Sequence, residues 1–225
     1  MTTILACGEG PHDIGMVEWS PQIEDHVQYD GWVQPILRKV FGVDIIIKTK
    51  RLSELVLFPN PRLNGLHGHG RRAALSKFIA KIEGCDRVVF VTDADTNVTA
   101  DAQAKLTSIW SGFAAVANGI AATGCVPQST SESWLLADPS AWSQITAGGL
   151  DHLPEGSPES LWGQTSDPAS NHPKQVFTRA CEAAGVSASR ETRVDLANAS
   201  DLHVLSARCP ESVIVFLDDC QSAPH

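Results

Sequence analysis

The run RVVFV at residues 87–91 is the feature that most limits how this chain can fold. Its apolar residues are consecutive rather than alternate, which is typical of a strand covered on both faces in a parallel sheet. Residues 2–7 and the β-branched segment VDIIIK at 43–48 are also predicted strands, and a further short strand is expected near 120–126. Strands of this kind require helices on both faces of the sheet.

Helical spacing of apolar residues lies between these predicted strands, at 31–41, 71–83 and 101–117, and a further helix is expected from about residue 131. Alternation of strands and helices over the first 140 residues predicts an α/β fold, with a mainly parallel, Rossmann-like sheet flanked by helices.

The composition changes after residue 140. Gly, Pro, Ser and Asn cluster from 147 to 173, which indicates long connections or a mobile segment, and helices are expected at 174–184 and near 200–220. We therefore divide the chain into a domain at 1–140 and a loop-rich, helical extension at 141–225 that packs on the same domain.

Charge and cysteine content narrow the classes of protein. A formal net charge of -9 argues against a generally basic surface for nucleic acid. No apolar run approaches the roughly 18 residues that span a bilayer, and the N-terminus lacks the features of a signal peptide, so a cytoplasmic protein without a membrane partner is expected. The six cysteines are widely spaced in or beside apolar segments, which favours buried, reduced thiols.

Acidic residues follow the predicted central strand in the segment TDAD, at Asp93 and Asp95. Side chains two positions apart on an extended chain point the same way, so both carboxylates are expected to converge on one divalent cation. An acidic turn at the end of a strand is the alternative, at about even odds.

A second carboxylate, Glu9, follows the first predicted strand between Gly8 and Gly10. It is expected to face the TDAD segment across the sheet, and the two glycines would let a phosphate approach the backbone closely. Glu132, in SESWLLADP, occupies the first turn of a predicted helix capped by a Ser or Thr at 129–131. Alternatively, Glu9 is a solvated turn residue and Glu132 is a carboxylate stabilised by the helix dipole.

The order GEGPHD, VTDAD, SESWLLADP resembles the Toprim-like proteins related to the OLD nucleases. It resembles especially the small stand-alone Toprim proteins encoded beside ATPases in prokaryotic defence loci directed against phage. The three motifs cover roughly residues 3–140, and HPKQVF (172–177) and ARCPESVIVFLDD (207–219) fit the helical tail of such proteins.

The resemblance implies a Toprim fold that binds Mg²⁺ or Mn²⁺ and hydrolyses phosphodiester bonds. By motif match, Glu9 would act as acid or base or hold a metal, Asp93 and Asp95 would be metal ligands, and Glu132 would serve a second ion. Lys174 would stabilise charge on the phosphate, although a surface lysine is the more frequent case. The chain carries no basic tract and no P-loop, so DNA delivery by a separate ATPase subunit is expected, with the oligomeric state open.

Two other functions remain open. VVFVTDADTN also fits the first motif of haloacid-dehalogenase phosphatases, with Asp93 as nucleophile and Asp95 as acid or base, and VIVFLDD could supply the closing acidic motif of that superfamily. The nearly ninety residues before Asp93, and the helical spacing around Asp218 and Asp219, argue against it. A non-catalytic Toprim module that binds a partner ATPase is the third possibility.

The segment GLHGHGRR at 65–72 is a candidate substrate-binding loop. His67 and His69 lie in a glycine-rich stretch, and Arg71 and Arg72 open the next predicted helix, where phosphate would meet basic side chains and free amides. A flexible polar loop is the alternative. The six tryptophans are expected in apolar helical faces, except Trp19, for which exposure is expected.

Overall fold

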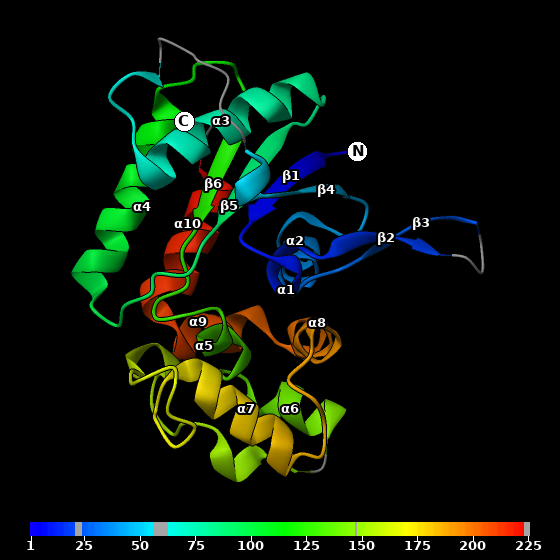
Figure 1. Cartoon of the computed structure of the whole chain (residues 1–225), viewed down its shortest axis with the longest axis vertical. Helices are drawn as coiled ribbons and strands as arrows, with labels where there is room; N and C mark the ends of the chain where they lie inside the picture. The colour runs from blue at the N-terminus through cyan, green and yellow to red at the C-terminus, as the bar shows by residue number, and fades with distance from the viewer. Residues whose placement is uncertain (21–23, 56–62, 147, 223–225) are drawn as a thin grey trace.

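A four-stranded parallel sheet forms the centre of the computed structural model, which describes residues 1–20, 24–55, 63–146 and 148–222. Its spatial order is β4-β1-β5-β6, with the strands at Thr3–Gly8 (β1), Ile46–Arg51 (β4), Arg87–Val91 (β5) and Ala121–Cys125 (β6) (Figure 1). The predicted α/β class with a parallel sheet and flanking helices is confirmed.

Ten α-helices are found among the described residues: α1 (Pro11–Ile14), α2 (Val33–Phe41), α3 (Gly68–Ile82), α4 (Thr99–Ala114), α5 (Glu132–Leu135), α6 (Pro139–Ile145), α7 (Pro173–Ala183), α8 (Arg190–Ala199), α9 (Leu202–Arg208) and α10 (Val215–Gln221). Short 3₁₀ turns occupy Leu52–Glu54, Leu150–His152 and Pro158–Ser160, and a π-helical turn occupies Pro210–Ile214. None of the helices in the described ranges has the length and hydropathy of a bilayer-spanning segment.

The two faces of the sheet pack against different sets of helices. Leu5, Cys7 and Phe90 face α3 and α4, whereas Ile4 and Ala6 face the other way, into a core shared with α2 and the helices after residue 132. This alternation follows from the two-residue period of a strand. The core that contains Ile4 and Ala6 also contains residues of the C-terminal helices. Those helices therefore complete the burial of that face of the sheet.

β1 and β5 lie side by side at the point where the chain connections diverge. From β1 the chain runs through α2 to β4 on one side, and from β5 it runs through α4 to β6 on the other. In open α/β sheets, such a switch point opens a crevice outside the carboxyl ends of the strands, where ligands bind. The residues after Gly8 and Val91 therefore occupy the position where function is expected.

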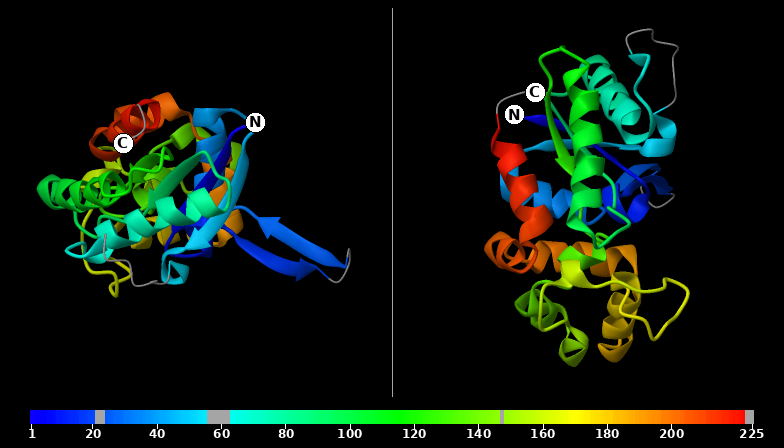
Figure 2. Two further views of the ribbon diagram at one scale, coloured as in Figure 1. Left: turned by 90° about the horizontal axis from the view of Figure 1, so that it is seen from above. Right: turned by 90° about the vertical axis from the view of Figure 1, so that its left-hand side faces the viewer.

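The sequence patterns did not predict the helices α1 and α8, nor a two-stranded antiparallel hairpin. β2 (Met16–Ser20) pairs with β3 (Asp25–Tyr29), and the hairpin projects from the body of the molecule in both Figure 1 and Figure 2. Of the predicted strands, that at 43–48 lies three residues further along the chain, as β4. The six cysteines are all described, buried and free of disulfides, as expected.

Exposure of the tryptophans differs from the prediction at one position. Trp19 is 56% exposed, as expected, and Trp32, Trp134 and Trp142 are buried. Trp162, expected in a core, is 43% exposed and packs against the His172 ring. It lies in the connection between the 3₁₀ turn at Pro158–Ser160 and α7, where no regular helix turns one of its faces to the core.

Candidate active site

Glu9 and Thr92 connect the carboxyl ends of β1 and β5. The strands are in register, with Cys7 opposite Phe90, so each residue stands two positions beyond a paired one. The Thr92 hydroxyl donates to Glu9 Oε1 at 2.7 Å. Because Thr92 is itself buried, this bond holds the exposed Glu9 carboxylate against the start of the TDAD loop.

Asp93 is the most enclosed carboxylate of that loop, with a side chain that is 15% exposed. Its Oδ1 accepts the Ser131 amide at 2.8 Å, and its Oδ2 lies 3.7 Å from Lys174 Nζ. Burial raises the pKa of Asp93 well above its usual value, and the negative charges of Glu132 and Asp13 raise it further, while Lys174 and the Ser131 amide lower it. Several negative groups thus face one another with incomplete compensation.

Asp95 does not share the direction of Asp93. Its φ of 56° is left-handed, so the backbone is not extended between the two residues, and its side chain is 64% exposed. Lys105, on α4, donates to Asp95 Oδ2 at 3.2 Å and to the Asp93 carbonyl at 2.7 Å. The extended geometry expected for TDAD is therefore wrong, and a different lysine contacts each carboxylate.

Glu132 begins α5 and is buried, with 4% of its surface exposed. Ser131 is the N-cap residue, but its side chain makes no capping bond, which differs from the expected cap. Arg193 Nη2, on α8, donates to Glu132 Oε1 at 3.0 Å, while Oε2 is buried without a hydrogen bond of normal geometry. Burial acts to raise the pKa of Glu132, but Arg193, Lys174 and the Thr130 hydroxyl together outweigh burial, and the pKa is lowered. Glu132 is thus half of a buried ion pair, and the Thr130 hydroxyl also interacts with its carboxylate.

Lys174 lies in the first turn of α7, after the N-cap His172, and brings a positive charge to the acidic group from the C-terminal helices. Burial acts to lower its pKa, but Glu132, Asp93 and Asp95 outweigh burial and the pKa is raised. Lys174 therefore stays protonated at neutral pH.

Asp13 is a further acidic residue near this group. It accepts the Trp32 indole N–H at 3.0 Å and the Gly10 amide at 3.2 Å. Burial raises its pKa, and the charges of Glu132 and Glu9 add to the shift. The sequence offered a signal for it, because Asp13 follows Glu9 within the GEGPHD motif.

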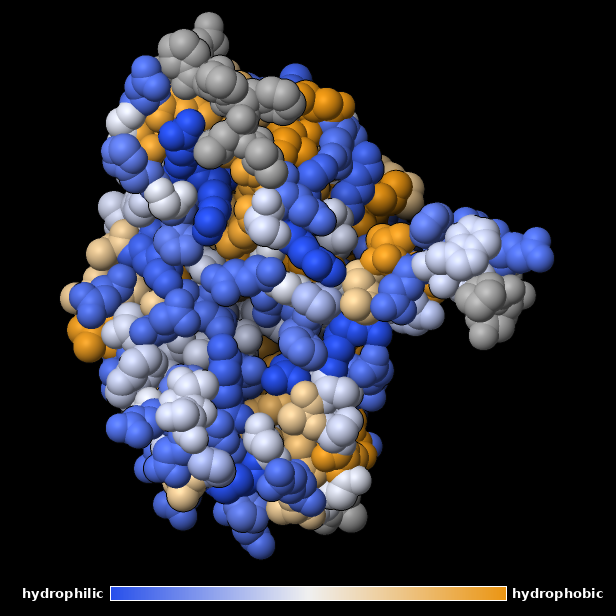
Figure 3. All heavy atoms as spheres, in the orientation of Figure 1, coloured by the Kyte–Doolittle hydropathy of each residue, from blue (hydrophilic) through white to orange (hydrophobic). Residues whose placement is uncertain are grey.

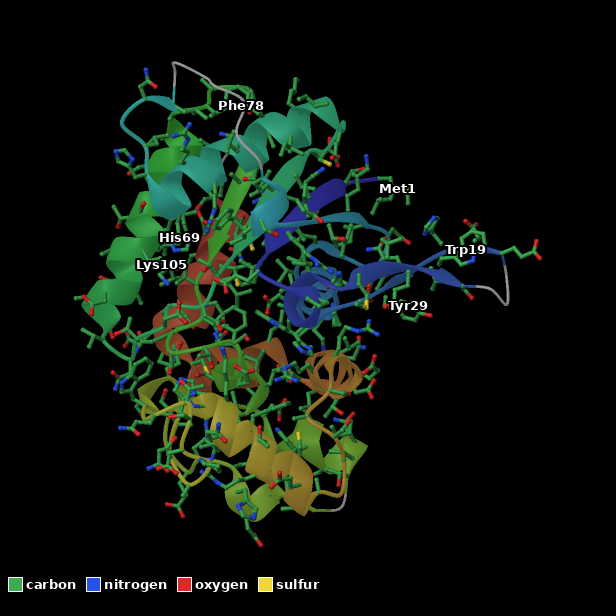
Figure 4. All side chains as sticks on the ribbon, in the orientation of Figure 1. Met1, Trp19, Tyr29, His69, Phe78 and Lys105 are labelled. Atoms are coloured by element: carbon green, nitrogen blue, oxygen red, sulfur yellow. The ribbon has the colours of Figure 1, made fainter. Side chains whose placement is uncertain are left out.

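His69 is the residue of the GLHGHGRR segment that the structure brings to the site. α3 begins at Gly68, with His67 as N-cap, so His69 lies in a helix instead of a loop. Its ring packs edge-on against Phe90, and burial together with the charges of Lys105 and Arg72 lowers its pKa. Figure 4 shows His69 and Lys105 on the facing helices α3 and α4. Arg71 is half-buried and Arg72 is exposed, and neither forms an ion pair in the described part of the chain.

Gly8 and Gly10 have different environments. A Cβ on Gly8 would come within 2.7 Å of Ile14 Cγ2, so packing of α1 against β1 already requires a glycine there. A Cβ on Gly10 would meet nothing within 4 Å. The space beside Gly10 is therefore open to a ligand, whereas Gly8 is explained by the fold.

The chemistry of these side chains suits a hard divalent cation. Glu9, Asp93, Asp95 and Glu132 offer carboxylate oxygens, which Mg²⁺ and Mn²⁺ prefer, and Glu132 Oε2 is without a hydrogen bond of normal geometry. As they stand, no three His, Cys, Asp or Glu side chains within the described ranges form a group that could hold a metal ion. To share one cation, Asp93 and Asp95 would have to turn toward one another and exchange their lysines for it.

Hydrophilic side chains cover much of the surface between the sheet domain and the C-terminal helices in the view of Figure 3. Sequence patterns did not identify Thr92, Lys105 or Arg193, whose roles depend on contacts between distant elements.

Comparison with family models, with curated proteins and with solved structures gives no match for this chain.

Proposed function

We propose that this protein is a Mg²⁺- or Mn²⁺-dependent nuclease that hydrolyses phosphodiester bonds in DNA, as a subunit of an ATPase-containing prokaryotic defence complex. The observation that carries the proposal is the hydrogen bond from Thr92 to Glu9. It links two strand ends at the switch point of the sheet and places Glu9 beside the TDAD loop. A Toprim-like arrangement would use these same residues.

Each side chain has a role in this reaction. Asp93 and Asp95 would hold the cation, with Glu132 Oε2 available to a second one, and the bound cations would supply Lewis-acid activation of water and of the phosphate. Glu9 would accept a proton from the attacking water or complete the ligand set. Lys174, released from Asp93, would stabilise the negative charge that develops on the phosphate.

The net negative charge of the chain supports the proposal that a separate subunit binds the DNA. A net charge of -9 weakens the binding of DNA to the protein as a whole, and Lys105 and Lys174 are already paired with carboxylates in the site. A separate ATPase subunit with a basic surface would hold the DNA and present it to the site.

Conversion of supercoiled plasmid to nicked and linear forms tests the proposal. The purified protein is assayed with Mg²⁺ or Mn²⁺, alone and together with any ATPase that is encoded beside its gene. We expect metal-dependent nicking that is lost in Glu9→Gln and Asp93→Asn. The matched control is Glu182→Gln, an exposed carboxylate on α7, which should retain full activity. Absence of nicking in every combination would overturn the proposal.

A phosphatase is the second candidate, favoured by the contacts of Asp93. The Ser131 amide and Lys174 hold its two oxygens in a fixed orientation, as an attacking nucleophile would require. Asp93 would attack the phosphorus of a phosphomonoester and displace the alcohol, to which Asp95 would give a proton. Water, giving a proton to Asp95, would then hydrolyse the aspartyl phosphate to phosphate and free Asp93. Asp219 plays no part, because α10 buries it against the Gly124 amide and the Trp110 indole. Release of phosphate from small phosphomonoesters without plasmid nicking would favour this candidate.

A further inference from the structure

The β2–β3 hairpin exposes an aromatic side chain far from any core. Val17 is 57% exposed and Trp19 is 56% exposed, and Figure 4 shows Trp19 on the projecting part of the hairpin. An isolated two-stranded hairpin is marginally stable in water, so placing large apolar groups on it without burying them points to a ligand.

The two faces of the hairpin differ in charge. Because side chains alternate along a strand, Val17 and Trp19 share one face with their cross-strand partners Gln28 and His26. The Trp19 and His26 rings meet edge to face, 5.4 Å apart. The acidic residues Glu18 and Asp25 lie on the opposite face, so the aromatic face carries no negative charge of its own.

The face of the hairpin that carries Val17 and Gln28 turns toward β4. Gln28 Nε2 donates to the Ile47 carbonyl of β4 at 3.3 Å, and Val17 lines a hollow of about 190 Å³ at the base of the hairpin. Lys50 and Arg51 line the same hollow, together with Glu54. Lys50 is paired with Glu83, but the Arg51 guanidinium makes no ion pair in the described part of the chain. Val17 and the two cations thus line one hollow, and Trp19 and His26 continue the face of Val17 outward along the hairpin.

This hollow adjoins the candidate active site. Arg51 is the register partner of Gly8, the residue before Glu9, and neighbouring strands lie about 5 Å apart. A strand of nucleic acid that reaches Glu9 would therefore meet Arg51 first, and would meet the aromatic side chains of the hairpin on extending further.

We infer that the corner between the β2–β3 hairpin and the end of β4 binds an unpaired stretch of the nucleic-acid substrate. Trp19 and His26 stack against bases, and Arg51 contacts a phosphate. Stacking on aromatic side chains beside cations is how proteins bind single strands without reading their sequence. The inference rests on the proposed nuclease function, and it specifies a substrate with a single-stranded segment next to the cleaved bond.

Binding of a labelled oligothymidylate, followed by fluorescence anisotropy in EDTA, tests the inference without cleavage. We expect Trp19→Ala to weaken binding about 10-fold, which is the scale of one base stacked on an aromatic ring, and Trp19→Phe to retain most of the affinity. Arg51→Ala should weaken binding and reduce the slope of log K against log salt by about 0.7, the value for one phosphate contact on a single strand.

Two matched controls localise the effect. Glu18→Gln changes the opposite face of β2, and Trp162→Ala removes the other strongly exposed tryptophan that the structure describes, so both should bind as the unmodified protein does. Equal binding by Trp19→Ala, Arg51→Ala and the unmodified protein would overturn the inference. So would a Trp19→Ala protein that loses self-association, or loses the ATPase subunit, while its oligonucleotide binding is unchanged.

The same samples separate this inference from the proposed function. Trp19-dependent binding in EDTA without cleavage in Mg²⁺ or Mn²⁺ would support the binding corner and contradict the nuclease. Plasmid nicking that requires Glu9, together with oligonucleotide binding indifferent to Trp19 and Arg51, would support the nuclease and contradict the binding corner.

Discussion

Lys174 Nζ lies 3.7 Å from Asp93 Oδ2, so a residue of the C-terminal helices reaches the loop that follows the central strand. Its positive charge lowers the pKa of Asp93, which burial and neighbouring carboxylates raise. We predict that Lys174→Met raises this pKa further, so that less Asp93 is ionised at a given pH. In a plot of nicking rate against pH, the acid limb should then move to higher pH. The maximal rate should also fall about 100-fold, as it does when a group that donates a hydrogen bond to the developing negative charge is removed.

Lys174→Arg is the control for this prediction, because it keeps the charge while changing the donor geometry. Its acid limb should coincide with that of the unmodified protein. An acid limb in Lys174→Met that does not move would show that Lys174 has no electrostatic effect on Asp93.

Thr92→Val should impair the site without unfolding the sheet. Valine has nearly the shape of threonine, but it cannot donate to Glu9 Oε1, so the exposed Glu9 carboxylate would lose its hydrogen bond to the residue that follows β5. We expect nicking to fall about 10-fold, since one hydrogen bond is worth about 1 kcal/mol and more when the acceptor is charged. Thr92→Ser keeps the donor and should restore the rate, and a Thr92→Val protein with an unchanged rate would contradict the orienting role.

Asp93→Asn should stabilise the folded protein while abolishing activity. The folded-state pKa of Asp93 is raised above its unfolded value, so the ionised carboxylate costs stability as the pH rises from the unfolded pKa through the folded one. The gain in melting temperature of Asp93→Asn over the unmodified protein should therefore be small at pH 4 and larger at pH 8. Thermal unfolding in EDTA at both pH values measures this gain.

Adding Mn²⁺ to the same samples gives the complementary result. A cation bound by the carboxylates should raise the melting temperature of the unmodified protein at pH 8 by mass action, and raise that of Asp93→Asn less. If Asp93→Asn were less stable than the unmodified protein at pH 8 in EDTA, the ionised Asp93 carboxylate would not lower the stability of the folded protein.

The parts of the fold that the sequence predicted are those that bury apolar surface periodically. β5 begins and ends at the predicted residues, and α2, α3, α4 and α7 lie within three residues of their predicted bounds. The β2–β3 hairpin was not predicted because its strands bury little apolar surface. Apart from Met16, Ser20 and Val27, which are half-buried, its residues are exposed, so no apolar period marks it.

Residues of the candidate site could be predicted where they lie in short motifs directly after strands. They could not be predicted where they join the site through contacts between segments that are far apart in the sequence. Glu9, Asp93 and Asp95 stand after strands, which is the position that a parallel sheet makes functional. Arg193 lies 61 residues from its partner Glu132, and nothing in the local sequence of α8 distinguishes it from other helical arginines. The left-handed backbone at Asp95, which separates the two loop carboxylates, also has no signature in the motif.

The buried pair between Glu132 and Arg193 yields a prediction about stability. Arg193→Met would leave the Glu132 carboxylate buried without its counter-charge, which typically costs about 3 to 5 kcal/mol in the free energy of unfolding. Without Arg193, burial would raise the pKa of Glu132 above its unfolded value, so the Arg193→Met protein should regain stability as the pH falls and Glu132 takes up a proton. Urea denaturation at pH 5 and pH 8 measures this difference.

The double variant Glu132→Gln/Arg193→Met separates the ion pair from the other contacts of Arg193, which also packs over the Phe177 ring and donates to the Ala188 carbonyl. Those contacts are lost in both variants that lack Arg193, so they cancel in a double-mutant cycle. We expect the double variant to be more stable than Arg193→Met at pH 8, because an amide is less costly to bury than an unpaired carboxylate. Additive effects of the two substitutions would mean that Arg193 stabilises the fold only through its contacts with residues other than Glu132, and that the Glu132 charge is neutralised by other groups of the site.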